Sequence, residues 1–133
     1  MASKPLFIML CSGEHEKIQL AAMIASVAAV SDRPVQVFVT MNALLAFERG
    51  LTPDQRYHGG HFHELFMTSK VPDAIELFAQ GKMLGDMKMW ACSMVLDLKH
   101  WETDTHLVED LFDGPAGLTV FLADAEEGEL ITI

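Results

Sequence analysis

Two apolar runs on either side of a long helix-forming segment constrain the fold of this chain more than any other feature. Residues 5–10 (PLFIML) form an unbroken apolar run, typical of a strand buried on both faces. Residues 35–40 (VQVFVT) are rich in β-branched side chains and predict a second strand. Between them, residues 14–31 place Ile18 and several alanines on one face, so a helix there can pack closely on a sheet. This strand–helix–strand unit predicts two parallel strands joined by a right-handed crossover.

The rest of the chain alternates between the same kinds of element. The pattern predicts helices over 42–48, 72–80, 93–98, 105–112 and 118–127, and strands over 88–92 and 130–133. Residues 50–70 are the least regular part, Gly81 is expected to end the helix before it, and residues 114–117 (GPAG) predict a turn and a helix start. For 118–127 a strand is the alternative, and a helix is favoured because apolar and acidic side chains fall on opposite helical faces. We therefore predict an α/β fold in one domain, residues 1–133, with a mostly parallel sheet between helices.

The charge of the chain excludes several classes of partner. With 9 basic and 19 acidic side chains the formal net charge is −10, which argues against nucleic acid and anionic membranes. No secretory signal is recognisable, and the longest apolar stretch, residues 20–30, falls short of the roughly 18 residues that indicate a membrane span. The two cysteines lie 81 positions apart with no CxxC motif, which fits a reducing cytoplasm. We therefore expect a cytoplasmic protein.

Residues that follow the predicted strands are the candidates for chemistry, because open α/β sheets bind ligands at the carboxyl ends of their strands. These residues are 11–13 (CSG), 40–42 (TMN) and 92–93 (CS). Glu14 and Glu16 fall in the first turn of the first helix, where they would repel a phosphate. No GxGxxG or GxxxxGK[ST] sequence occurs. Nucleotide binding is not expected, and no cofactor is predicted.

Cys92 is the strongest of these candidates. If the strand ends at Cys92 and a helix begins at Ser93, the sulfur lies beside unpaired backbone amides that favour the reactive thiolate. Lys88, four residues back, is roughly 13 Å away along an extended strand and is not an obvious partner for the thiol. Free cysteines are more often buried packing residues than reactive ones, so the alternative is that Cys92 only packs in the core.

Three histidines in the irregular segment raise the possibility of a metal site. His58, His61 and His63 could supply imidazole ligands to zinc or nickel. Their spacing matches no standard structural site, and the two glycines among them favour a polar, solvated loop. No metal is therefore predicted, and the three histidines stay weak candidates.

Two segments of the chain carry a resemblance to a known family. They are the opening LFIMLCSGEHEKIQLAAMIASVAAVSDRPVQVFVTMNAL and the later GDMKMWACSMVLDL, and the most specific part is the strand-end motif at residues 88–94 (KMWACSM). Over nearly its whole length the chain resembles the DsrE/DsrF/DsrH-like proteins, in particular the DsrE2-like branch that is often labelled peroxiredoxin family protein. No Pro, Thr and Arg environment suited to a peroxidatic cysteine accompanies Cys92, so peroxidase activity is not expected.

The resemblance implies a three-layer α/β/α domain with five strands and flavodoxin-like layering, and homo-oligomers, commonly trimers or hexamers. It also implies sulfur relay, in which Cys92 accepts sulfane sulfur as a persulfide and passes it to a TusA-like partner, as a sulfur carrier or sulfurtransferase. Some relatives carry another cysteine nine positions earlier, where this chain has Met83, so no resolving thiol is expected there. Cys11, Ser12 and Ser93 are the auxiliary candidates.

Two other functions are weighed against sulfur relay. The first is a non-catalytic oligomeric binding module in which Cys92 only packs. The second is a metal-binding protein built on His58, His61 and His63.

Overall fold

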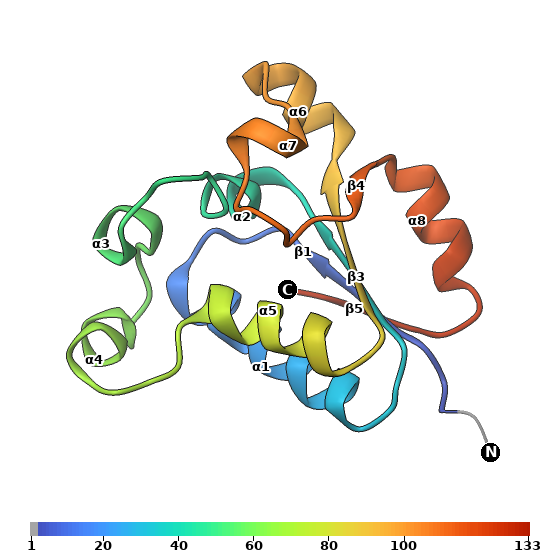
Figure 1. Ribbon diagram of the computed structural model, residues 1–133, viewed down its shortest axis with the longest axis horizontal. Coiled ribbons are helices and arrows are strands. Elements are labelled where there is room, and N and C mark those ends of the chain that lie inside the picture. Colours follow the sequence, from blue (N-terminus) through green and yellow to red (C-terminus); the bar gives the residue numbers. More distant parts are fainter. Residues whose placement is uncertain (1–2) are drawn as a thin grey trace.

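A computed structural model describes residues 3–133 and places a five-stranded sheet at the centre of the molecule (Figure 1). All neighbouring strands are parallel, and their order across the sheet is β4-β3-β2-β1-β5. The strands are β1 (Leu6–Leu10), β2 (Val35–Val39), β3 (Met87–Cys92), β4 (Gly114–Ala116) and β5 (Glu129–Thr132). The predicted α/β class is confirmed, as is the five-stranded parallel sheet that the resemblance implies.

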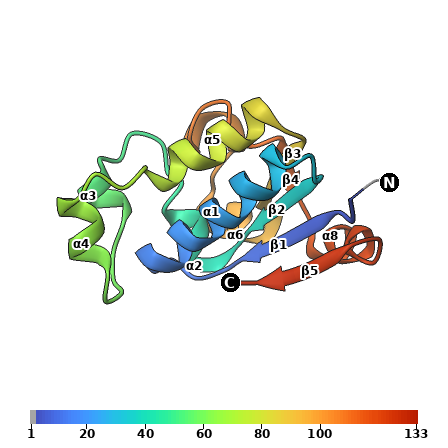
Figure 2. The ribbon, with the colours of Figure 1, turned by 90° about the horizontal axis from the view of Figure 1, so that it is seen from below.

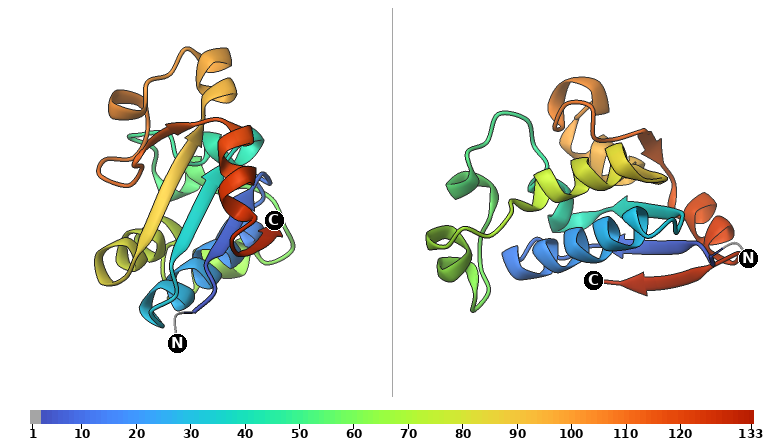
Figure 3. Two further views of the ribbon diagram at one scale, coloured as in Figure 1. Left: turned by 90° about the vertical axis from the view of Figure 1, so that its right-hand side faces the viewer. Right: turned by 60° about the horizontal axis from the view of Figure 1, so that its bottom comes forward.

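Helices cover both faces of this sheet. Within residues 3–133 they are α1 (His15–Val30), α2 (Met41–Leu45), α3 (Pro53–Arg56), α4 (His63–Thr68), α5 (Ala74–Leu84), α6 (Ser93–Lys99), α7 (Thr103–His106) and α8 (Leu118–Ala125). α1 and α5 lie side by side on one face, and α8 lies on the other (Figures 1 and 2). α3 and α4 project beyond the carboxyl ends of β1 and β2, while α6 and α7 lie beyond the carboxyl end of β3 (Figure 3). The loops that could form a site therefore gather at the carboxyl ends of the strands.

The sheet face under α1 and α5 is a closed apolar core. Successive side chains of a strand point to opposite faces, so alternate residues share this face. From the three central strands β1, β2 and β3 they are Leu6, Ile8, Leu10, Val35, Val37, Val39, Met87, Met89 and Ala91, and all are buried. α1 packs on them through Ile18 and the buried alanines Ala21, Ala22, Ala25 and Ala29. These small side chains let the helix lie close to both the sheet and α5.

The opposite face is held to α8 mainly by aromatic rings. The Phe121 ring of α8 lies 5.7 Å from Phe7 and 5.1 Å from Phe38, measured between ring centroids. The residues that β1, β2 and β3 place on this face are Phe7, Met9, Gln36, Phe38, Lys88, Trp90 and Cys92. Trp90 is half-buried and donates its Nε1–H to Gln36 Oε1 over 2.9 Å. One helix thus leaves part of this face open at β3.

Two predictions about helices are wrong: the end of the helix at Gly81 and the helix over residues 105–112. The packing gives a reason for each. Gly81 does not end α5, which continues to Leu84, because glycine is needed where the helix crosses α1. A Cβ at Gly81 would lie 3.2 Å from the Cα of Ser26. The helix predicted over 105–112 is replaced by the four-residue α7 at Thr103–His106. The backbone after α7 instead pairs with the segment after α2, as in the bond from Val108 N to the Phe47 carbonyl, 2.9 Å.

The turn predicted at residues 114–117 is a strand over most of its length. Gly114, Pro115 and Ala116 form β4, paired in parallel with the end of β3. Proline is tolerated there because β4 is an edge strand and its missing N–H faces away from the sheet. Gly117 then precedes α8, so the predicted helix start is correct. The irregular segment 50–70 contains the two short helices α3 and α4.

Residues 3–133 include no helix with the length and apolar content needed to cross a bilayer.

Candidate functional site

The carboxyl ends of three neighbouring strands bring Cys11, Thr40 and Cys92 into one row. The pairing registers align the residues that directly precede these three in β1, β2 and β3. The bond from Thr40 N to the Leu10 carbonyl, 2.9 Å, continues the ladder toward this row. By strand alternation, the three positions fall on the α8 face of the sheet. Both cysteines therefore lie at one level of one face of the sheet.

Cys92 ends β3 and directly precedes α6. Its side chain is 6% exposed and the thiol is free. In the sheet ladder it is paired with Ala116 of β4, whose side chain is a single methyl group. Gly117 follows Ala116 in the chain. A Cβ added to Gly117 would meet no atom within 4 Å, so open space adjoins the β4 edge of the sheet. Cys92 is therefore buried, but close to the open edge.

Cys11 differs from Cys92 in its partner and its exposure. It is half-buried, and its thiol donates to the carbonyl of Ile133 over 3.3 Å. Two strand spacings separate it from Cys92, which is about 10 Å between Cα atoms. A disulfide requires Cα atoms within about 7 Å, so the two thiols cannot pair without movement of the backbone. Thr40 lies between them.

Ser12 and Ser93, the other auxiliary candidates, lie in different cavities. Ser93 lines a cavity of about 360 Å³ with Trp101 and Pro115. Ser12 lines a cavity on the other side of the strand ends and accepts a hydrogen bond from the Glu14 amide over 3.2 Å. The four candidates from the sequence therefore do not form one cluster.

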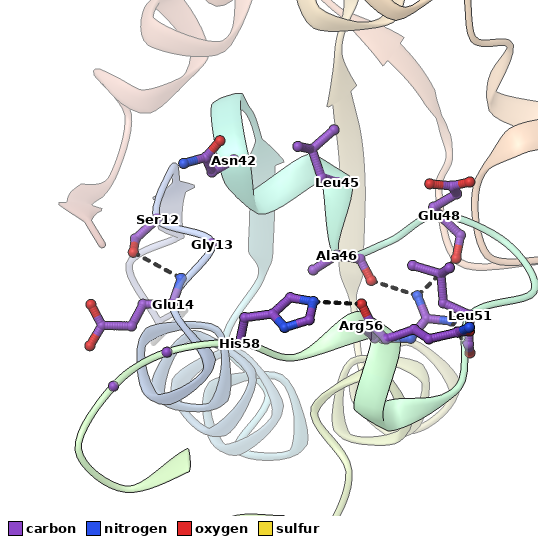
Figure 4. Close-up of a pocket in the computed structure, with 13 residues that line it drawn as sticks. Ser12, Gly13, Glu14, Asn42, Leu45, Ala46, Glu48, Leu51, Arg56 and His58 are labelled. Carbon is purple, nitrogen blue, oxygen red and sulfur yellow. Dashed lines mark hydrogen bonds between the residues drawn. The ribbon is translucent and has the colours of Figure 1, made fainter.

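The cavity that contains Ser12 has a volume of about 680 Å³ and is built from strand-end loops and the segment after α2 (Figure 4). Figure 4 shows the His58 ring between Glu14 and Arg56. Arg56 donates to the carbonyls of Ala46 and Glu48, over 2.5 and 2.9 Å, so its charge holds the segment after α2 in place. Neither cysteine lines this cavity.

Two backbone features tighten the wall of this cavity. A Cβ at Gly13 would lie 2.9 Å from the carbonyl oxygen of Asn42, so the loop after β1 touches α2 and needs glycine there. Met41 has a φ of 51°, a left-handed conformation that is uncommon outside glycine. The sequence marked both loops as strand-end candidates, but their contact depends on strand pairing.

The histidines weighed as metal ligands do not converge. His58 contacts the Gln55 carbonyl over 2.7 Å, His61 is exposed, and His63 contacts a different histidine, His15. Among residues 3–133, no group of three His, Cys, Asp or Glu side chains is placed to hold a metal ion. This geometry gives no support to a metal-binding function.

His15 is a functional candidate that the sequence reasoning missed. It is buried, its ring stacks on Tyr57 with centroids 4.3 Å apart, and its Nδ1 lies 2.8 Å from His63 Nδ1. Tyr57 in turn donates its hydroxyl to Asp73 over 2.8 Å. Burial lowers the pKa of His15, the neighbouring His63 lowers it further, and Asp73 partly opposes both. No local motif could have revealed this pair, because 48 positions separate the two histidines.

Burial also raises the pKa of Tyr57, with the Asp73 hydrogen bond acting in the same direction. The phenol therefore stays protonated, and it can keep donating to the carboxylate.

Comparison with known proteins supports the fold and says nothing of the chemistry. No protein-family model matches the chain, and no curated protein matches it. The chain is similar to a solved structure of a protein of unknown function, MTH1491 from Methanobacterium thermoautotrophicum, with a TM-score of 0.64 and 13% sequence identity. The similarity covers 98% of this chain and 100% of the other. At this identity it establishes a shared fold alone.

Proposed function

We propose that this protein accepts sulfane sulfur as a persulfide on Cys92 and passes it to a partner protein. The observation that carries the proposal is the position of Cys92, a free thiol at the carboxyl end of a strand, directly before α6. Cys92 is the N-cap residue of α6, where first-turn amides lack intrahelical partners and can donate to an anion. The resemblance of residues 88–94 to a sulfur-relay motif supports the same role for Cys92.

The proposed transfer is a thiol exchange with no net oxidation. The Cys92 thiolate attacks the outer sulfur of a donor persulfide, R–S–SH, and forms a new S–S bond. The S–S bond of the donor breaks, and the donor leaves as a thiolate that takes up a proton. A thiolate on the acceptor then attacks the outer sulfur on Cys92 in the same way, and Cys92 returns to a thiolate. One sulfur atom crosses in each step, and no external oxidant or reductant is needed.

Access to the sulfur depends on the edge formed by β4. The thiol is buried, and Ala116 lies next to it in the ladder. The outer sulfur of a persulfide extends about 2 Å beyond Sγ, because that is the length of an S–S bond. In a side-chain rotamer that points toward Gly117, the outer sulfur would lie nearer the open space there than Sγ does.

The exposed side of α6 supports docking of a partner beside Cys92. Met94 and Leu98 are 51% and 71% exposed and lie one helical turn apart. Methionine adapts to different partner surfaces. We expect the acceptor to be a TusA-like protein in a reducing cytoplasm, with a basic rim that complements a chain of net charge −10. A homo-oligomer of three or six copies, as the resemblance implies, is part of this proposal.

A second function, a non-catalytic binding module, is favoured by one specific observation. The cavity of about 680 Å³ lies at the carboxyl ends of β1 and β2, where open α/β sheets bind ligands, yet neither cysteine lines it. In such a module, Cys92 would only fill space under β4.

Intact-protein mass spectrometry after incubation with polysulfide tests the sulfur-relay proposal. The wild type and the matched Cys11→Ser variant are expected to gain about 32 Da, the mass of one sulfur atom added by exchange. Cys92→Ser is expected to gain nothing. Peptide mapping of the wild type should place the added sulfur within the peptide that contains Cys92.

Equal loading of Cys92→Ser and the wild type, or no loading of any variant, would refute the proposal. Unchanged thermal stability of Cys92→Ser would exclude unfolding as the cause of its lost loading. If no variant loads, the binding-module function is the one left to pursue, with ligand screens directed at the cavity around His58 and Asn42.

A further inference from the structure

A small cavity on the α8 face of the sheet lies beside Cys92. Its volume is about 340 Å³, and residues of β2, β3, β4 and α8 line it. Ala116, the ladder partner of Cys92, lines this cavity together with Gly117. Trp90 lines it as well, and it precedes Cys92 by two residues in β3, so both side chains point to the same face. The cavity therefore adjoins the position of the thiol.

The lining of this cavity is mostly apolar. Trp90 contributes to it from β3, and Val120 and Phe121 contribute from α8. The indole N–H of Trp90 donates to Gln36 Oε1 over 2.9 Å, which fixes the ring and satisfies its one polar atom. Among the lining residues that the structure describes, only Asp124 carries a charge. The cavity therefore suits an apolar, uncharged group better than an anion.

We infer that this cavity binds the R group of the persulfide donor R–S–SH, and that the donor is a small molecule whose R group is apolar and uncharged. This inference rests on the proposed function of Cys92 and adds a substrate class to it. The Cys92 thiolate forms an S–S bond to the outer sulfur of the donor, and the S–S bond of the donor breaks. The hydrogen stays on the transferred sulfur, and R–S⁻ leaves and takes up a proton from water, so the exchange involves no net oxidation.

The length of the reacting group agrees with the position of the cavity. In thiol exchange the attacking, central and leaving sulfurs lie nearly in line, and each S–S bond is about 2 Å long. The leaving sulfur is therefore about 4 Å from Sγ of Cys92, and R lies beyond it. Trp90 is two residues back along β3, which is roughly 7 Å along the strand. A donor that lies along β3 thus places its R group beside the indole ring.

Charge disfavours an anionic R group in the same position. Glutathione persulfide has a net negative charge, and it would meet Asp124 on a chain whose own net charge is −10. Lys88, the lysine of β3, lies on the same face as Cys92 but does not line the cavity. A donor protein is also disfavoured, because about 340 Å³ is near the lower end of the range for small-molecule sites.

Rates of sulfur loading with two donors, measured by intact-protein mass spectrometry, test the inference. The donors are benzyl persulfide, whose R group is apolar, and glutathione persulfide. The preference of a protein is the ratio of its two rates, divided by the same ratio for free cysteine, so that the intrinsic reactivity of each donor cancels. We expect the wild type to prefer benzyl persulfide by about tenfold or more, as apolar pockets discriminate between ligands.

Val120→Trp, with Val27→Trp as the matched control, connects this preference to the cavity. Both valines lie on helices and are similarly exposed, 61% for Val120 in α8 and 63% for Val27 in α1. Val120→Trp fills the cavity and should lower the preference to the value of free cysteine, whereas Val27→Trp should keep it. Asp124→Lys should also lower the preference, by raising the rate with glutathione persulfide.

A wild type without preference, an unchanged preference in Val120→Trp, or an equal loss in Val27→Trp would overturn the inference. Inorganic polysulfide, which has no R group, separates this failure from failure of the proposed function. Loading by polysulfide without a donor preference refutes the cavity site alone, and no loading of the wild type by any donor refutes both. If Val120→Trp does not fold or blocks Cys92 itself, Asp124→Lys decides, and its unchanged preference would overturn the inference.

Discussion

The two faces of the sheet are built in opposite ways. Under α1 and α5 the contacts are spread over many small and medium side chains, and the nine residues that β1, β2 and β3 place on that face are all buried. Under α8 the contacts are concentrated in three rings, Phe7, Phe38 and Phe121. On this second face Cys92 ends β3, near the open space at Gly117, and Cys11 follows the end of β1 two strands away. The closed face contains more of the buried apolar side chains, and the sparsely covered face holds the residue for which we propose chemistry.

This difference follows from the connections between strands. The segments after β1 and β2 return across the same face and carry the two longest helices, α1 with 16 residues and α5 with 11. The connection from β4 to β5 crosses the other face and carries only the eight residues of α8. One short helix cannot cover five strands, so β3 and β4 keep an uncovered border beside Cys92.

Removing the central ring of the α8 face should produce the largest effect. Phe121→Ala is expected to lower the free energy of unfolding by about 4 kcal/mol, because it deletes a buried ring from a contact with few other members. Hydrogen exchange should show the loss of protection confined mainly to α8 and β5. The matched variant is Phe78→Ala, a fully buried ring on α5, which should reduce protection in α5 and α1 instead. Identical exchange patterns for the two variants would contradict a division of the molecule by faces.

Enlarging a small residue should test the closed face, with a smaller effect. Ala25→Leu is expected to cost about 2 kcal/mol in unfolding free energy, because α1 lies too close to its neighbours to admit three more carbons. Ala79→Leu, on the exposed side of α5, is the control and should change stability by less than about 0.5 kcal/mol. Urea denaturation measures both. An unchanged free energy of unfolding for Ala25→Leu would mean that the closed face has room for a larger side chain, contrary to the close packing of α1.

The parts of the fold that the sequence predicts well are those whose pattern is long. The strand–helix–strand unit over residues 5–40 emerges from periodicity alone, because each element has enough residues to establish a period. β4 could not be found this way, since Gly114, Pro115 and Ala116 have low strand propensity and become a strand only by pairing with β3. The helix end placed at Gly81 fails for a related reason, because that glycine is required by the crossing with α1 rather than by a turn.

The candidate site shows the same limit. Strand-end positions could be predicted for Cys11 and Cys92, but their separation of about 10 Å depends on the strand order, which places β2 between them. The separate cavities of Ser12 and Ser93 also depend on that order. The contact of His15 with His63 is a purely tertiary feature, since it joins the start of α1 to a segment 48 positions away.

The smallest predicted effect concerns the point where the closed face ends, at the amino terminus of α1. Here His15 holds α4 through His63, and one such hydrogen bond contributes about 1 kcal/mol. The pKa of His15 is lowered in the folded protein from its ordinary 6.5, so below that pH the unfolded chain binds a proton more readily than the folded one. The associated stability is therefore fully present above pH 6.5 and is lost as the pH falls through the folded-state pKa. Protonating both rings also removes the acceptor from the His15–His63 bond.

Thermal unfolding of two proteins tests this contact. The wild type should lose more stability between pH 7.5 and 5.5 than the His63→Ala variant, which keeps the buried His15 ring but lacks the second imidazole. Hydrogen exchange should place the loss in α4 and leave the sheet protected. Equal pH dependence in the two proteins, or a loss spread over the sheet, would mean that this contact does not set the local stability of the segment.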